Sequence, residues 1–347
     1  MNIFYHLPGL FEFYDLYKAF LPLFREHREY FYDWCEIGSI YGAPSDCIWG
    51  GGRVGFGDAE PRKVAELVRE FGISARLTFS NSLIREEHLA DRKCNKLCEM
   101  FEIGADSIAN ETRTFQNAGE KHANQNANKN REISDAKEMY ADQGKSENRD
   151  EKEMRTVQNG IIIHSDLLLN YIKTKYPNYY FVSSTTKVIT DFEQFKAELS
   201  REEFRYVVPD FRLNKQFDKL KALTDAQKQK VEFLCNECCW FGCPDRKKCY
   251  ENVSQKSLGE NCEDHKCVSP TAQRGYRFSD AMKNPGFIGI EDIQNIYAPA
   301  GFRHFKIEGR SLGSALILEF LLYYMTKPEY QLKVREEIYL DSTLDLF

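Results

Sequence analysis

Short apolar runs alternate with amphipathic stretches along most of this chain. Runs rich in β-branched and aromatic residues predict eight strands, at residues 2–5, 33–37, 75–79, 161–164, 179–182, 205–208, 232–234 and 304–307. Apolar residues at helical spacing predict helices between most of them, at residues 11–30, 61–71, 85–101, 191–199, 214–223 and 314–325. Eight strand–helix repeats within 347 residues predict a TIM-type (β/α)8 barrel.

A doubly wound open sheet is the alternative fold, but no G-x-G-x-x-G fingerprint follows an early strand. Residues 105–158 depart from the repeating pattern because they contain almost no large apolar side chains. Such a segment cannot bury enough surface to offset its ordering entropy. We therefore expect a single α/β barrel domain over residues 1–347, with a disordered or loosely helical insertion at 105–158.

Composition and the amino-terminal sequence limit the class of protein. The formal net charge of −6 does not favour a general polyanion binder. The first residues lack the basic and apolar regions of a signal peptide, and the longest apolar run, 315–325, contains Glu319 and is too short to cross a membrane. We expect a cytoplasmic protein with reduced cysteines and no membrane partner.

Barrel enzymes take their reactive groups from the carboxyl ends of the strands. Polar residues occupy or follow that end of every predicted strand, so the sequence predicts a polar ring at one mouth of the barrel. The candidates for proton transfer in this ring are Glu36, His164, Asp210 and Glu308.

Two arginines of the ring are candidates for binding an anionic substrate. Glu308 and Arg310 alternate with Gly309 and therefore face the same side of the eighth strand. Arg310 either binds a substrate carboxylate or pairs with a barrel acid such as Glu36 or Asp210. Arg212 repeats this alternation beside Asp210, and Asn236 completes the predicted substrate-binding set.

Cysteines gather in the segment after the seventh strand. Seven of the eleven lie between residues 235 and 267, and thiols this dense in a reducing compartment indicate metal ligands rather than disulfides. The spacing differs from the paired C-x2-C of a zinc ribbon and suits an irregular loop around an iron–sulfur cluster. Structural zinc and free thiols remain alternatives, whereas Cys94 and Cys98, one helical turn apart, are expected to pack in the core.

Two motifs carry a family resemblance. The stretch Lys306-Ile307-Glu308-Gly309-Arg310 and the pattern Asn236-Glu237-x-Cys239-x3-Cys243-Pro-x-Arg246 together resemble the collagenase-like peptidase family (peptidase family U32), in a divergent branch from anaerobic bacteria. The resemblance covers roughly residues 161–325. It implies a [4Fe-4S] cluster at the barrel mouth and oxygen-independent hydroxylation of a nucleobase or a quinone ring. It also implies the ligand candidates Cys239, Cys243, Cys262, Cys267 and Cys249.

Three functions follow as hypotheses. The first is iron–sulfur redox or hydroxylation chemistry on a small anionic molecule or nucleobase, with a reductant protein as partner. The second is a metal-dependent hydrolase or peptidase in which zinc activates water, although the chain has no H-E-x-x-H pair. The third is a non-catalytic scaffold in which the cysteines only clip a loop around a metal.

Overall fold

Eight parallel strands form the centre of the molecule. The computed structural model describes residues 2–50, 58–102, 157–274 and 277–344. Its strands are β1 (Ile3–Pro8), β2 (Cys35–Gly42), β3 (Ala75–Phe79), β4 (Gly160–Ile163), β5 (Tyr180–Ser183), β6 (Phe204–Val207), β7 (Glu232–Leu234) and β8 (His304–Lys306). All eight predicted strands are present.

The strands form a nearly closed barrel. Their order is β6-β5-β4-β3-β2-β1-β8-β7, and every pairing between neighbours is parallel. A parallel bridge between Val207 and Val231 joins the two edge strands. The structure thus has the α/β TIM-type barrel that the repeats predict.

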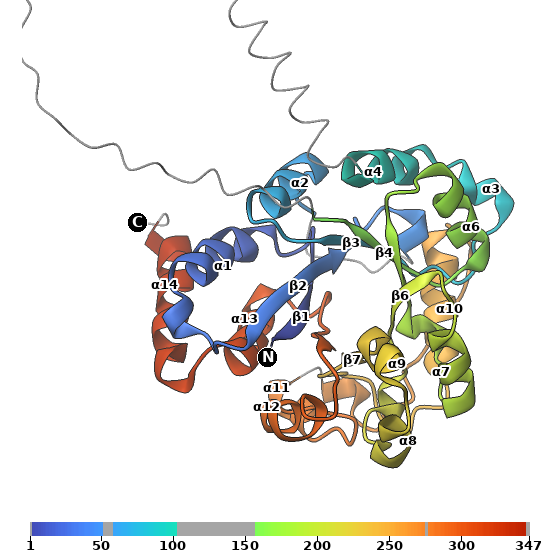
Figure 1. Cartoon of the computed structure of the whole chain (residues 1–347). Helices are drawn as coiled ribbons and strands as arrows, with labels where there is room; N and C mark the ends of the chain where they lie inside the picture. The colour runs from blue at the N-terminus through green and yellow to red at the C-terminus, as the bar shows by residue number, and fades with distance from the viewer. Residues whose placement is uncertain (1, 51–57, 103–156, 275–276, 345–347) are drawn as a thin grey trace, which may run out of the picture. The chain divides into compact units, whose positions relative to one another are not determined.

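Helices surround the ring of strands (Figure 1). They are α1 (Tyr14–Glu26), α2 (Pro61–Glu70), α3 (Glu86–Leu89), α4 (Arg92–Glu102), α6 (Asp166–Lys175), α7 (Phe192–Leu199), α8 (Phe217–Lys221), α9 (Asp225–Lys230), α10 (Arg246–Ser257), α11 (Phe278–Met282), α12 (Ile290–Asp292), α13 (Ser314–Met325) and α14 (Gln331–Leu344). Side-chain caps start several of them: Ser165, Asp191 and Thr224 each accept a hydrogen bond from a backbone N–H of the first turn.

The apolar residues form two separate clusters. The large one fills the layer between strands and helices and includes Tyr5, Leu77 and Phe305. The small one lies inside the barrel and consists of Tyr41, Ile162, Tyr180, Val182, Val208 and Leu234. Alternation along each strand explains the division, because successive side chains point to opposite faces of a sheet.

Charged side chains fill the barrel interior below the small cluster. Arg76 Nη1 donates a 2.5 Å hydrogen bond to Glu232 Oε2, and His6 Nε2 lies 3.4 Å from the same oxygen. His6 also contacts Ser39 Oγ at 2.8 Å and His304 Nδ1 at 3.2 Å. A buried charge is tolerated only when it is paired, so this network depends on all of its members being present.

The second strand corrects one prediction. It continues to Gly42, so Glu36 lies at its amino end, away from the mouth. There its carboxylate lies 3.6 Å from Arg28 Nη2, and its side chain is 39% exposed. Gly38 lies inside the strand, where the register with β1 shifts opposite His6. A Cβ at this position would lie 2.6 Å from Cε1 of the His6 imidazole. The glycine therefore permits close approach and does not mark a turn.

Two further predictions concern the insertion at 105–158 and membrane-spanning helices. The predicted insertion at 105–158 lies outside the described residues except for its last two positions. Among the described helices, none has the length and apolar character needed to cross a lipid bilayer.

Candidate active site

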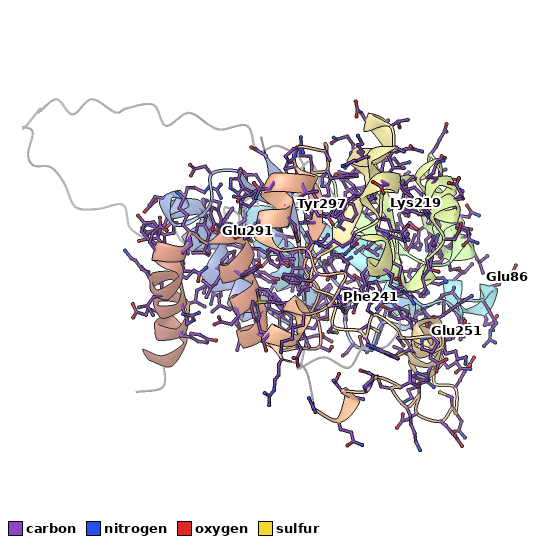
Figure 2. The ribbon with its side chains drawn as sticks, turned by 90° about the horizontal axis from the view of Figure 1, so that it is seen from below. Glu86, Lys219, Phe241, Glu251, Glu291 and Tyr297 are labelled. Atoms are coloured by element: carbon purple, nitrogen blue, oxygen red, sulfur yellow. The ribbon has the colours of Figure 1, made fainter. Side chains whose placement is uncertain are left out.

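The segment that follows β7 covers the carboxyl end of the barrel. Its helix α10 packs against η2 (Ile48–Gly50) after β2 and η3 (Thr185–Lys187) after β5. Asn81 Nδ2, after β3, donates to the Ser254 carbonyl of α10 at 3.3 Å. Phe241 and Glu251, labelled in Figure 2, mark the loop and the helix of this segment. The cysteine-rich region is therefore a cover over the mouth, and 12 of its residues form the helix α10.

A small cavity remains beneath this cover. Its volume is about 40 Å³, close to the ~30 Å³ that one water molecule occupies in the liquid. Its lining comes from six strand ends and from α10 and comprises Tyr41, Thr78, Ser80, Ile162, Ser184, Thr185, Thr186, Leu234, Tyr250, Lys306, Glu308 and Arg310. The polar ring predicted from the sequence is thus present, and it surrounds a narrow cavity.

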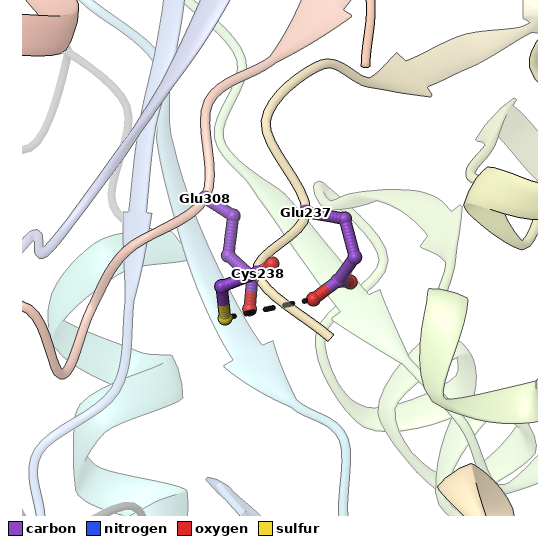
Figure 3. A group of neighbouring side chains, drawn as sticks. All are labelled: Glu237, Cys238 and Glu308. Carbon is purple, nitrogen blue, oxygen red and sulfur yellow. Dashed lines mark hydrogen bonds between the residues drawn. The ribbon is translucent and has the colours of Figure 1, made fainter. Parts of the chain in front are cut away.

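Two carboxylates and a thiol meet at the edge of the mouth (Figure 3). Ligand atoms of Glu237, Cys238 and Glu308 lie within 4.8 Å of one another, with Cys238 Sγ 3.7 Å from Glu237 Oε1. Glu308 also hydrogen-bonds Glu237. Two carboxyl groups joined in this way share one proton. The group therefore combines a proton donor with possible metal ligands.

Arginines surround the base of the cysteine loop. Arg246, at the start of α10, donates through Nη2 to Glu237 and lies 3.3 Å from Asp210 Oδ2. Arg212 binds both oxygens of Asp210, at 2.6 and 3.0 Å, and donates to the Cys243 carbonyl at 3.1 Å. Arg246, Asp210 and Glu237 are all buried. These ion pairs fix the loop onto the ends of β6 and β7.

The same arginines set the protonation of their neighbours. Burial raises the pKa of Glu237, but the charge and hydrogen bond of Arg246 outweigh burial and lower this pKa to about 2. Glu237 is therefore ionised near pH 7. Burial raises the pKa of the Cys239 thiol to about 12, and Arg246 opposes that rise. A metal that binds Cys239 would displace this proton.

The predicted cysteine ligands fall into two neighbourhoods. Cys239 and Cys243 lie at the arginine pair and interact electrostatically with each other. Cys249 and Asn252 lie on α10, and the Asn252 amide contacts Cys262 Sγ at 3.6 Å. Cys267 is exposed farther along the segment. In the described part of the chain, no three cysteine sulfurs approach within 4.8 Å of one another.

The predicted substrate-binding residues lie at the mouth but already have protein partners. Arg310 Nε donates to Glu12 Oε1 at 2.6 Å, and its Nη2 donates to the Ala43 carbonyl at 2.6 Å. Its partner is thus Glu12 rather than Glu36 or Asp210. Asn236 makes two hydrogen bonds to the backbone of Glu308, at 2.7 and 3.0 Å, and so holds the end of β8 in place.

His164 follows β4 at the same end of the barrel. Its Nδ1 contacts Thr186 Oγ1, a cavity-lining atom, at 2.9 Å. Burial, reinforced by the charges of Lys187 and Lys247, lowers the pKa of His164 to about 4. The imidazole is therefore neutral near pH 7 and a weaker base than an ordinary histidine.

Lys306 is a cavity residue that the sequence reasoning did not select. Its Nζ lies 3.9 Å from the centroid of the Tyr41 ring and 3.8 Å from Glu232 Oε1. Burial lowers the pKa of Lys306 to about 8, although Glu232 opposes the change. Its position in the sequence could have identified it. Lys306 precedes Glu308 by two residues and Arg310 by four, so all three face the same side of the strand, toward the barrel interior.

Comparisons with known proteins give a distant structural likeness and no match in sequence. No family model matches the chain, and no curated protein matches it. Among solved structures, the chain is similar to one described as the U32 peptidase Mk0906, with a TM-score of 0.42 and 11% identity over 89% of this chain and 94% of that one. A likeness this distant carries no inference about activity.

Proposed function

We propose that this chain is an iron–sulfur barrel enzyme that acts on a small anionic molecule or a nucleobase without molecular oxygen. One observation carries the proposal. The loop after β7 brings Cys238, Cys239 and Cys243 to the strand ends that hold Glu308 and Arg212. Metal ligands, proton carriers and buried cations at the same mouth are what such an enzyme requires.

The donor set fits an iron–sulfur cluster better than a tetrahedral zinc ion. Zinc with four thiolates at ~2.3 Å draws the sulfurs to about 3.8 Å from one another. The cysteines of this segment are more widely spread over the loop, α10 and the stretch after it. A cubane cluster accepts sulfurs that lie farther apart, because each cysteine binds a different iron. Cys239 and Cys243 would be the first ligands, with Cys262, Cys267, Cys249 and Cys238 as candidates for the others.

When bound, a [4Fe-4S] cluster supplies one-electron transfer or an iron that polarises a substrate oxygen. The protein's own groups would do the rest. Glu308, which hydrogen-bonds the ionised Glu237, would donate a proton to the substrate. His164 would accept a proton through Thr186. Arg212 and Arg246 offset the negative charge of the thiolates beside them.

Anaerobic purification tests this proposal directly. We expect a brown protein with about four irons and four sulfides per chain. Cys239→Ala and Cys243→Ala should lose most of the iron. The matched control is Cys35→Ala, which removes a buried thiol at the amino end of β2. Stoichiometric zinc without sulfide, or equal iron in all three variants, would overturn the proposal.

A second candidate is a hydrolase that depends on a divalent cation, and the group Glu237–Cys238–Glu308 favours it. A hard cation prefers the carboxylate oxygens, and the bound water would attack the substrate. Arg246 competes for Glu237, which weakens this candidate. Loss of bound Mn²⁺ or Zn²⁺ in Glu308→Gln, with Cys239→Ala unaffected, would support it over the cluster.

A further inference from the structure

Two cysteines outside the cysteine-rich segment lie unusually close together. Cys47 Sγ and Cys94 Sγ are 2.9 Å apart, although the residues are 47 positions apart in the sequence. Cys47 belongs to the loop between β2 and α2, and Cys94 to helix α4. Both side chains are buried, at 3% and 0% exposure. At this distance one thiol donates a hydrogen bond to the other sulfur.

The hydrogen bond makes the two sulfurs unequal. The bond to Cys47, together with burial, raises the pKa of Cys94 and keeps it a thiol. Cys47, in contrast, lines a pocket on the outside of the barrel, and Cys94 does not. An external disulfide therefore reaches Cys47 first, and Cys94 is placed to resolve the product.

Cys47 can be reached from a pocket on the outside of the barrel. The pocket has a volume of about 640 Å³, and its lining includes Cys47, Arg62, Lys93, Lys96 and Met100. Cys94 does not line it, which agrees with the different roles of the two sulfurs. The lining also includes Asp46, Asp58 and Glu60, so it carries both signs of charge. A small zwitterionic disulfide such as oxidised glutathione fits this volume, with its carboxylates toward the basic side chains and its ammonium groups toward the acids.

We propose that Cys47 and Cys94 form a reversible disulfide by exchange with a low-molecular-weight disulfide. The Cys47 thiolate attacks one sulfur of that disulfide, and the S–S bond breaks to release the first thiolate. Cys94 then gives its proton to the released thiolate and attacks Cys47 Sγ, which expels the second small thiolate. Two protein thiols are oxidised and the external disulfide is reduced to two thiols. The proton of Cys94 goes to the first released thiolate, and water returns to the second the proton that it took from Cys47.

The bridge would connect this pair to the mouth of the barrel. The loop that carries Cys47 also provides the Ala43 carbonyl, which accepts from Arg310. It provides the Ile48 carbonyl too, which accepts from Ser257 Oγ of α10 at 3.2 Å. Oxidation would tie this loop to α4 and restrict both contacts. The proposal does not depend on the iron–sulfur cluster, because neither sulfur belongs to the segment proposed to hold it.

Disulfide mapping of the full-length protein tests the proposal. The reduced protein would be equilibrated with mixtures of reduced and oxidised glutathione, quenched with N-ethylmaleimide, digested and analysed by mass spectrometry. We expect one peptide pair that joins Cys47 to Cys94 and that disappears after reduction. The midpoint temperature of thermal unfolding should be roughly 5 °C higher for the oxidised form than for the reduced form, since the bridge closes a loop of nearly fifty residues.

Variants separate this pair from its neighbour Cys98, which interacts with Cys47 across the same space. Cys98→Ser should keep the bridge, whereas Cys47→Ser and Cys94→Ser should lose it. In Cys94→Ser, Cys47 should accumulate as a mixed disulfide with glutathione. A Cys47–Cys98 bridge, or a wild-type protein in which both thiols stay free in excess oxidised glutathione, would overturn the proposal.

Discussion

Removal of Arg310 from its buried ion pair with Glu12 should cost more stability than the loss of an ion pair at the protein surface. The two side chains are 5% and 2% exposed, and their nearest nitrogen and oxygen atoms lie 2.6 Å apart. Arg310→Met removes the cation and leaves the Glu12 carboxylate buried and without its counter-charge. Loss of one partner of a buried pair costs about 3–5 kcal/mol. The Ala43 carbonyl also loses its donor, which adds about 1–3 kcal/mol.

A double-mutant cycle isolates the charge. Glu12→Gln in the Arg310→Met background removes the stranded carboxylate and should recover about 3 kcal/mol of that loss. The assay is urea unfolding followed by circular dichroism and by intrinsic fluorescence, with coincident transitions required. A loss below 1 kcal/mol for Arg310→Met would refute the reasoning. If that stable variant were also inactive, Arg310 would instead be a substrate-binding residue, as the sequence suggested.

Two further changes follow from the structure. Burial lowers the pKa of His304 to about 4, so below pH 6.5 the unfolded chain binds a proton that the folded chain does not. The contribution of His304 to stability should fall by up to about 3 kcal/mol between pH 6.5 and 4. His6 and His164, whose pKa values burial also lowers, act in the same direction, so His304→Gln should reduce the slope in urea titrations without removing it. Gly309→Ala should cost roughly 2–4 kcal/mol in thermal unfolding, since φ is +142° and the new Cβ would lie 2.4 Å from Ile317 Cδ1. Gly72→Ala, with φ of +62° and open space, should cost only about 1 kcal/mol.

The strands could be predicted from the sequence because a parallel barrel buries them on both faces. Runs such as Ile161–Ile163 are continuous and β-branched, and this pattern distinguishes them from the amphipathic helices. The same reasoning missed α10. Its buried residues are Arg246 and Ser254, so no apolar stripe marks it as a helix. It forms where charged and polar contacts, which hydrophobic periodicity does not register, hold it to the mouth.

Side-chain pairing was the part that the sequence could not supply. The partners of Arg310 and Arg76 lie 298 and 156 positions away, and several acids were equally suitable. Local rules identified which strand ends are polar, but not which charges meet. A charge at an inward position of an apolar strand, as at Arg76, was the available signal for the buried network. Such a charge indicates that an oppositely charged partner must lie nearby, but it does not identify that partner as Glu232.

Closure of the mouth connects metal binding to substrate access. A cavity of about 40 Å³ is far below the roughly 300–1,000 Å³ of small-molecule sites, so a substrate requires α10 to move. Arg246 holds α10 through Asp210 and Glu237, and the same arginine lies against Cys239. Ligation of Cys239 together with Cys249 of α10 would join the loop and the helix through the metal. Metal loading should therefore hold the cover more firmly, and α10 amides should exchange hydrogen more slowly in the loaded protein than in the metal-free one.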